Sequence, residues 1–489
     1  MKNLNIKNLI NNYWLLILII LQPILDVIAF FTSGNGSTVS GYFRLLTMIA
    51  LVIIVFANEK NNKRFLIAFL VIVAVYGLHI INSIRVGYIN PKEDIIYMAK
   101  VAYMPILALC FCCFIKKTED ADICVKSILI NFIIVSIIIL LSYITKSYTP
   151  TYDGPIGISG WVIDDNRCCH SDILSTLCIF ASYFAVKIKN KFFNIIIPFV
   201  VFGLLISNGT KACYLTLFVI SAAYPSFLLF KYFIKKEKYS ENQIIITIVF
   251  IIIFVLGIII YPYSPRYKVD HRENSYLDNV EQKFAEDMKE YGYDIYSLEP
   301  EEIEKNQFLK EQYSDYYLHR VYGSLPILVE TYGTDRIMKA LNYTVDSKYL
   351  EDTREMKKLY ASFIFEDSDF LTKLVGFEFS KLGENKSVDL ENDWFAIFYY
   401  YGYLAIIAYI GLIIYFIIRV IRVCKADFTN QINLLNFSLV LCFAIQLGLG
   451  YFSGAMLRRP NASIYLSLVI ALLYYQTDLS KIRGKRLKT

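Results

Sequence analysis

The chain has 489 residues, of which 56% are hydrophobic and 16% aromatic, whereas only 19% are charged. Its charges gather in short clusters between uncharged apolar runs such as 128–141, which excludes a large soluble core and indicates a membrane protein with many spans. The net charge of +6 reflects these clusters and gives no reason to expect nucleic acid as a partner. Most of the ten cysteines lie within or at the ends of apolar runs, where they act as small hydrophobic residues, so a bound metal is not expected.

Apolar runs long enough to cross a bilayer recur along the chain. They predict an all-α polytopic membrane protein with about 12 transmembrane helices. The expected spans are 13–31, 42–57, 65–84, 95–115, 127–145, 170–186, 192–207, 210–230, 243–261, 394–418, 431–451 and 461–477. The chain is thereby divided into nine spans in residues 1–261, a polar region in 262–393, and three spans with a basic tail in 394–489.

The orientation follows from Lys and Arg, which concentrate in short loops that face the cytoplasm. With the N-terminus in the cytoplasm, the clusters Lys60–Arg64, Lys187–Lys191 and Lys231–Lys238 all fall on the cytoplasmic side. We therefore expect a multi-pass protein of the cytoplasmic membrane, with both termini in the cytoplasm and region 262–393 outside it.

Region 262–393 carries more acidic than basic residues, together with many Tyr and Phe. The aromatic content argues against a disordered tether. Stretches 277–291, 300–316 and 335–365 mix charged residues with scattered apolar ones. We expect a small extracytoplasmic helical subdomain between the ninth and tenth spans.

Four cations fall near the expected outer ends of the spans, namely Arg44, Lys211, Arg458 and Arg459. An ionisable side chain at mid-bilayer costs about 2.5–3.5 kcal/mol on insertion scales, so such residues tend to face a cavity or a partner. Together they favour a site for a lipid diphosphate, because Arg pairs with phosphate oxygens in bidentate fashion. Each alone has a simpler interpretation: an arginine that snorkels to lipid phosphates, a lysine at a helix end, or a structural ion pair between Asp26 and Arg44.

Four segments carry a further signal. They are Gly160–Asn166, Ser207–Ala212, His319–Tyr322 followed by Gly376–Phe379, and Glu391–Trp394 followed by Tyr401–Leu404. Their order, with the large loop before the last spans, resembles the O-antigen ligase and O-antigen polymerase superfamily, in its Gram-positive-type branch that includes teichuronic acid polymerases. The resemblance implies a membrane-embedded fold of the glycosyltransferase-C-like type.

Members of that family are glycosyltransferases that take a glycan from an undecaprenyl-diphosphate carrier at the outer face and join it to an acceptor. The resemblance therefore implies an undecaprenyl-diphosphate-linked oligosaccharide, an acceptor glycan and membrane lipids as partners, and a reaction that needs no metal or cofactor. By position, Lys211 matches the family's cation after small residues, Arg320 a loop arginine, and Asn166 a substrate-binding residue before a span. Glu391 stands where many ligases have a histidine, so Glu391 or Asp393 takes over its role, or that role lies elsewhere.

The chemistry of such a transfer sets what the site must contain. Glycosyl transfer passes through an oxocarbenium-like transition state. Fixed Arg and Lys side chains neutralise the charge on the departing phosphate, and a carboxylate near the interface accepts the proton of the attacking hydroxyl. Glu391 and Asp393 are the candidates for that base, with His319 as a further one. The alternative for Glu391 and Asp393 is that they belong to the start of a helix. Asn or Asp commonly caps a helix, and acidic residues are favourable in its first turn.

Two other classes of function stay open from the sequence. A transporter or flippase of lipid-linked glycans would share the number of spans and the cytoplasmic termini, although no repeated halves are visible. A non-catalytic glycan-binding partner would keep the loop and the spans but tolerate the loss of Lys211, Arg320 and Glu391.

Overall fold

The structure is a computed structural model that describes residues 6–32, 36–58, 62–163, 167–235, 239–382, 389–452, 454 and 456–479. Helices make up most of these residues, and no β-strand occurs among them. This confirms the expected all-α class.

Nine helices precede the large loop. Their bounds are α1 Ile6–Phe31, α2 Gly36–Asn58, α3 Lys63–Val86, α4 Pro91–Phe114, α5 Thr118–Ile144, α6 Arg167–Lys187, α7 Lys191–Asn208, α8 Lys211–Lys235 and α9 Glu241–Ile260. Four helices follow the loop. They are α17 Asp393–Ala426, α18 Phe428–Gln431, α19 Leu434–Phe452 and α20 Pro460–Gln476.

The described part of the loop consists of helices and two 3-10 turns. Its elements are the 3-10 turn η2 Tyr261–Tyr263, α10 Pro265–Glu290, α11 Pro300–Lys305, α12 Gln307–Ser324, α13 Pro326–Ala340, α14 Ser347–Leu350, α15 Thr353–Glu366, α16 Phe370–Val375 and the 3-10 turn η3 Phe379–Leu382. The helix expected at 300–316 is divided at Asn306, because its side chain caps α12 by accepting hydrogen bonds from Phe308 N and Leu309 N. α10 begins earlier than expected, because Ser264 caps it and Pro265 fits its first turn.

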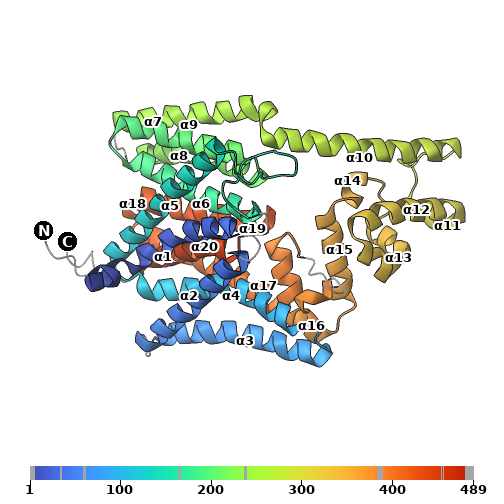
Figure 1. The fold of residues 1–489 in the computed structure, drawn as a ribbon, viewed down its shortest axis with the longest axis horizontal. Helices are drawn as coiled ribbons and strands as arrows, with labels where there is room; N and C mark the ends of the chain where they lie inside the picture. Colours follow the sequence, from blue (N-terminus) through green and yellow to red (C-terminus); the bar gives the residue numbers. More distant parts are fainter. Residues whose placement is uncertain are drawn as a thin grey trace.

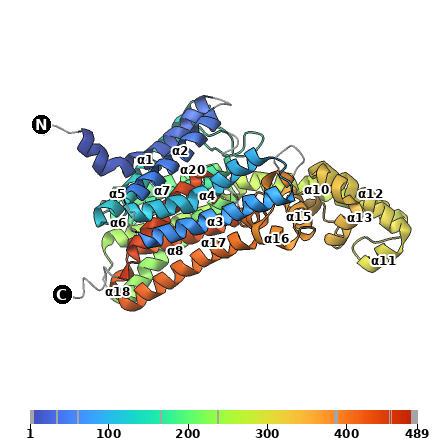
Figure 2. The ribbon, with the colours of Figure 1, turned by 90° about the horizontal axis from the view of Figure 1, so that it is seen from below.

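Eleven described helices are long and apolar enough to cross a membrane, and they correspond to the first eleven expected spans. The twelfth expected span is α20, a helix of 17 residues that is about 26 Å long. Every residue from Asn461 to Leu473 is buried, and α20 packs on α4, α6 and α19 in the middle of the bundle (Figure 2).

The loop helices lie beyond one end of the membrane bundle (Figure 1). α10 continues outward from the end of α9, and α11–α15 gather beside it (Figure 1). The start of α1 and the short helix α18 lie toward the opposite end in both views (Figures 1 and 2). The charge distribution predicts that this opposite end faces the cytoplasm.

α17 is not one straight span. Gly402 interrupts it with φ 68° and ψ −168°, so that Asp393–Tyr401 forms a separate helical segment on the loop side. The interruption fits against α16, because a Cβ at Gly402 would lie 2.5 Å from the carbonyl of Leu374. The loop is thereby fixed to α17 through backbone contacts that only glycine permits.

Candidate functional site

The tight turn between α7 and α8 brings two helix starts together. Gly209 in this turn has φ +75°, and a Cβ there would lie 2.6 Å from Cβ of Pro265, the first residue of α10. Because glycine allows this approach, the start of α10 lies directly against the start of α8. Arg266 is thereby brought to the same end of the bundle as Lys211.

Replacing Gly209 with alanine is expected to lower the free energy of unfolding by about 1–3 kcal/mol, since the new Cβ meets Pro265 in a backbone conformation that costs other residues strain. The measurement is thermal unfolding in detergent. The matched control is Gly203→Ala in α7, where nothing lies within 4 Å of the added Cβ. Equal stability of both variants would contradict the contact.

Arg266 is buried and pairs with both carboxylate oxygens of Asp270. It also donates to the Tyr152 hydroxyl at 3.0 Å, and the Tyr261 hydroxyl donates to Asp270 at 3.1 Å. Burial disfavours the charge on Asp270, but Arg266, the Tyr261 hydroxyl and Lys211 outweigh it and lower the pKa of this carboxyl. The group is therefore an ionised cluster at the mouth of the bundle.

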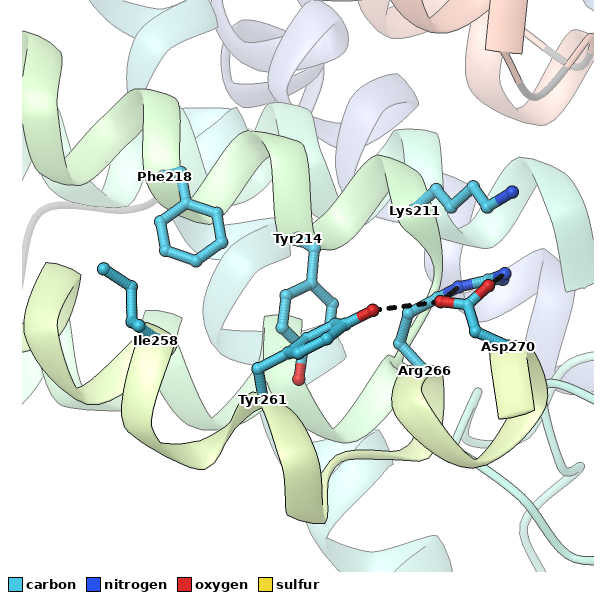
Figure 3. Close-up of a pocket in the computed structure, with 7 residues that line it drawn as sticks. All are labelled: Lys211, Tyr214, Phe218, Ile258, Tyr261, Arg266 and Asp270. Atoms are coloured by element: carbon cyan, nitrogen blue, oxygen red, sulfur yellow. Dashed lines mark hydrogen bonds and ion pairs between the residues drawn. The ribbon is translucent and has the colours of Figure 1, made fainter. Parts of the chain in front are cut away.

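A cavity of about 490 Å³ opens beside this cluster. Its lining residues are Lys211, Tyr214, Phe218, Ile258, Tyr261, Arg266 and Asp270. The charged side chains lie at one end of the cavity, and Phe218 and Ile258 lie at the other, along the spans (Figure 3). The cavity is therefore polar at its outer end and apolar along the spans, just as a lipid is polar at its headgroup and apolar along its chain.

A second set of charges continues the cluster toward the loop. Burial raises the pKa of Tyr152, and the guanidinium groups of Arg266 and Arg354 act in the opposite direction, so Arg354 also lies near this hydroxyl. Arg354 Nε is 2.5 Å and Lys357 Nζ is 3.2 Å from the Glu391 carboxylate. Burial would raise the pKa of Glu391, but these two cations lower it, and the carboxylate is ionised at neutral pH.

Three of these cations stand in the first turn of a helix: Lys211 begins α8, and Arg266 and Arg354 are second in α10 and α15. A helix N-terminus carries a partial positive charge, so a cation there costs about 0.3–1 kcal/mol instead of stabilising the helix. Helix stability therefore does not explain the arrangement. The three cations instead add to the partial positive charge of helix starts on the loop side of the bundle, and this combination favours an anion.

A profile of the family described as O-antigen ligase like membrane protein matches residues 7–479. The chain belongs to this family. No curated protein matches the chain. Family membership makes it a multi-pass membrane protein that acts on glycans, and it supports glycosyl transfer of the ligase type.

The residues that the family resemblance suggested are not all brought together. Lys211 and Glu391 belong to the connected cluster described above. Arg44 is buried within the bundle, where it binds Asp26 at 2.8 Å and Gln22 at 2.9 Å. The ion pair between Arg44 and Asp26, which the sequence left open, is therefore present.

Asp393 begins α17 and Arg458 lies in the segment before α20. The two side chains are buried against each other, with Arg458 Nε 2.6 Å from Asp393 Oδ1. Arg459 is half-buried and is 3.6 Å from the carboxylate of Asp389. Asn392 caps α17 by accepting from two backbone N–H groups, so the helix-start interpretation of this segment holds for Asn392.

The two loop residues suggested by the sequence lie on α12. Arg320 binds Glu351 at 3.0 Å, just before α15 begins, and so contacts the segment that carries Arg354. His319 is exposed and faces Asp315 at 3.5 Å within the same helix. Asn166 lies outside the described residues.

Sequence reasoning missed Arg266, Arg354 and Lys357. A signal was present for the first two, because Ser264-Pro265 and Asp352-Thr353 are helix-start patterns that place the next residue in a first turn. An Arg in that position interacts unfavourably with the helix dipole, and this indicates a role other than helix stability.

Proposed function

We propose that this protein transfers glycan units from a lipid-diphosphate carrier, undecaprenyl diphosphate in a bacterial cytoplasmic membrane, to an acceptor glycan at the outer face. The observation that carries the proposal is the amphipathic cavity with Lys211 and Arg266 at its outer end. The prenyl chain would follow Phe218 and Ile258, and the diphosphate would lie at the cations.

The cations of this region are already balanced by carboxylates. Arg266 pairs with Asp270, and both Arg354 and Lys357 pair with Glu391. A diphosphate carries more charge and more acceptor oxygens than one carboxylate, so it would compete for these cations. On binding, Arg354 and Lys357 would move part of their hydrogen bonding from Glu391 to the phosphate.

The reaction itself follows from this exchange. The bond between the anomeric carbon and the phosphate oxygen breaks, the electron pair leaves with the diphosphate, and the acceptor hydroxyl forms the new glycosidic bond. The cations stabilise the leaving group, and a carboxylate takes the hydroxyl proton. We assign the base to Glu391, because its pKa rises when Arg354 and Lys357 turn toward phosphate.

Two predicted residues receive other roles in this proposal. Arg320 holds the start of α15 through Glu351 and so positions Arg354. Asp393 is buried against Arg458 and has a structural role, not a catalytic one. His319, exposed on the outer side of α12, is left without a part in the transfer.

The test is glycan transfer by the purified protein in nanodiscs, supplied with a lipid-diphosphate oligosaccharide and followed by the length of the product. Lys211→Ala is expected to lower kcat/KM by about 10²-fold, the effect of removing one fixed charge from a developing anion. Lys268→Ala is the matched control, because Lys268 is an exposed lysine on α10. Unchanged transfer by Lys211→Ala, or equal loss in both variants, would contradict the proposed site.

A further inference from the structure

The loop helix α16 runs along the outer end of α3. Three successive contacts set its direction: Asp369 with Arg85 at 2.5 Å, Thr372 with Asn82 at 3.1 Å, and the Val375 carbonyl with the His79 ring at 3.0 Å. Contact positions on α3 decrease as those on α16 increase. Arg85 and His79 are six positions apart, which corresponds to about 9 Å of helix. α16 therefore descends beside α3 toward the membrane interior.

The chain turns at the bottom of this descent. Gly376 has φ +84°, and a Cβ there would lie 2.2 Å from the Tyr400 carbonyl, directly before the interruption of α17 at Gly402. Phe377 N donates to the Tyr399 carbonyl at 3.2 Å. Irregular backbone at membrane depth requires protein around it, and here α3 and α17 supply it.

After this turn the chain packs against the first turns of α4. The Glu378 carboxylate accepts from the backbone N–H groups of Ile89 and Asn90, in the turn between α3 and α4, at 2.8 and 3.1 Å. Phe379 N donates to Asp94 Oδ1 at 2.8 Å. The chain that descends from Asp369 is back on the loop side of the bundle at Asp393, where α17 begins.

Two large apolar side chains of this segment face outward. Phe370 is 75% exposed and Leu371 49%, whereas the rest of α16 is buried or half-buried. The outer end of α3, on which α16 packs, exposes Ile81 and Ile84, which continue the exposed apolar residues that α3 carries along its length. Phe370 and Leu371 are therefore large apolar side chains exposed on a segment that packs on a spanning helix, and exposed apolar side chains of this kind mark an interaction site.

We propose that residues 369–382 form a re-entrant segment that inserts Phe370 and Leu371 into the outer leaflet. The occupant of this surface is the lipid leaflet, because α16 packs on α3, a spanning helix that carries exposed apolar side chains along its length. Insertion fixes the height of the loop above the bilayer. It does so close to α15 and α17, both of which pack on this part of the chain. The proposal holds whether or not the protein transfers glycans.

The test uses tryptophan fluorescence in liposomes that contain phosphatidylcholine brominated on its acyl chains, which quenches only side chains within the lipid. Phe370→Trp is expected to increase the fluorescence over that of the unchanged protein, and bromolipid is expected to quench at least half of this increase. Ile81→Trp on α3 is the positive control. Tyr296→Trp, 63% exposed in the distal loop, is the negative control and is expected to respond to aqueous iodide instead.

Two outcomes would overturn the proposal. Quenching of Phe370→Trp by iodide and not by bromolipid would place the segment in water. Protection from both quenchers, lost on dilution of the protein in the bilayer, would show that a second copy of the chain covers the patch. A second measurement uses Phe370→Ser with Leu371→Ser, for which several-fold faster trypsin cleavage at Lys373 and Lys381 is expected; an unchanged rate would equally contradict insertion.

Discussion

Arg354→Ala is expected to lower glycan transfer by about 10²–10³-fold, the range found when one donor to a developing oxyanion is removed. Its effect on folding should be small. Arg354 is 51% exposed, and an ion pair with that exposure contributes about 0–1 kcal/mol to stability. The measurement is the rate of product formation beside thermal unfolding of the same preparation. Loss of transfer without loss of stability identifies a functional charge.

Two controls sharpen this result. Arg336→Ala removes an arginine of similar exposure from α13, where it pairs with Asp367 and Glu366, and transfer should persist. Arg320→Ala tests the original sequence prediction: as a positioning residue it should reduce transfer less than Arg354→Ala. If Arg320→Ala abolishes transfer while Arg354→Ala is active, the assignment of the loop cation to α15 is wrong.

The pH profile separates charge from position. Glu391 accepts a proton only when it is ionised, and Arg354 and Lys357 lower its pKa against the effect of burial. Without Arg354 the pKa of Glu391 rises, so the acid limb of the residual activity should move to higher pH. A variant that only misplaces the loop would lose rate without moving this limb.

The membrane architecture could be read from the sequence because it depends on local composition. Runs of apolar residues define α1–α9, α17 and α19, and each is long enough to be recognised without its neighbours. Even the buried helix α20 was found by the same rule. The break at Gly402 escaped it, since the need for glycine there comes from α16 on a distant part of the chain.

The site could be predicted only in part. Lys211 was identified because it stands alone at a helix start after small residues, which is a local signal. Arg44 and Arg458 were likewise expected near the outer ends of spans, yet both are buried and bound to protein partners. The partner of Arg458 lies 65 positions away at Asp393, and no local pattern reveals that pairing. Tertiary pairing therefore decides which cations are available to a ligand.

The cations of the loop show the same limit of prediction from local sequence. Arg320 was chosen because it adjoins a histidine and aromatic residues, whereas Arg354 stands in an ordinary polar helix. Only the fold brings Arg354 to Glu391 and toward Tyr152. The functional value of a charged loop residue thus depends on which helix end it faces.

Arg458→Met is expected to destabilise the protein by about 3–5 kcal/mol, because it leaves the buried carboxylate of Asp393 without its counter-ion. All three guanidinium nitrogens of Arg458 already have partners. The acceptors are the side chains of Asp393, Tyr97 and Asp389 and the backbone carbonyls of Leu390 and Gly454. Five donors with five acceptors leave none for a phosphate. The measurement is thermal unfolding in detergent, with Arg459→Met as the matched control; its half-buried pair should cost about 0–1 kcal/mol.

A double variant distinguishes a structural arginine from a substrate-binding one. If the role of Arg458 is to balance Asp393, then Asp393→Leu added to Arg458→Met removes the unpaired charge and restores part of the lost stability. If Arg458 instead binds the diphosphate, the single variant keeps its stability and loses transfer, and the double variant gains nothing. The first outcome is the one we expect, because Leu457 N also donates to Asp393 at 2.6 Å and closes the pair against solvent. The same contacts join the start of α17 to the segment before α20, so this pair holds Glu391 in place without touching substrate.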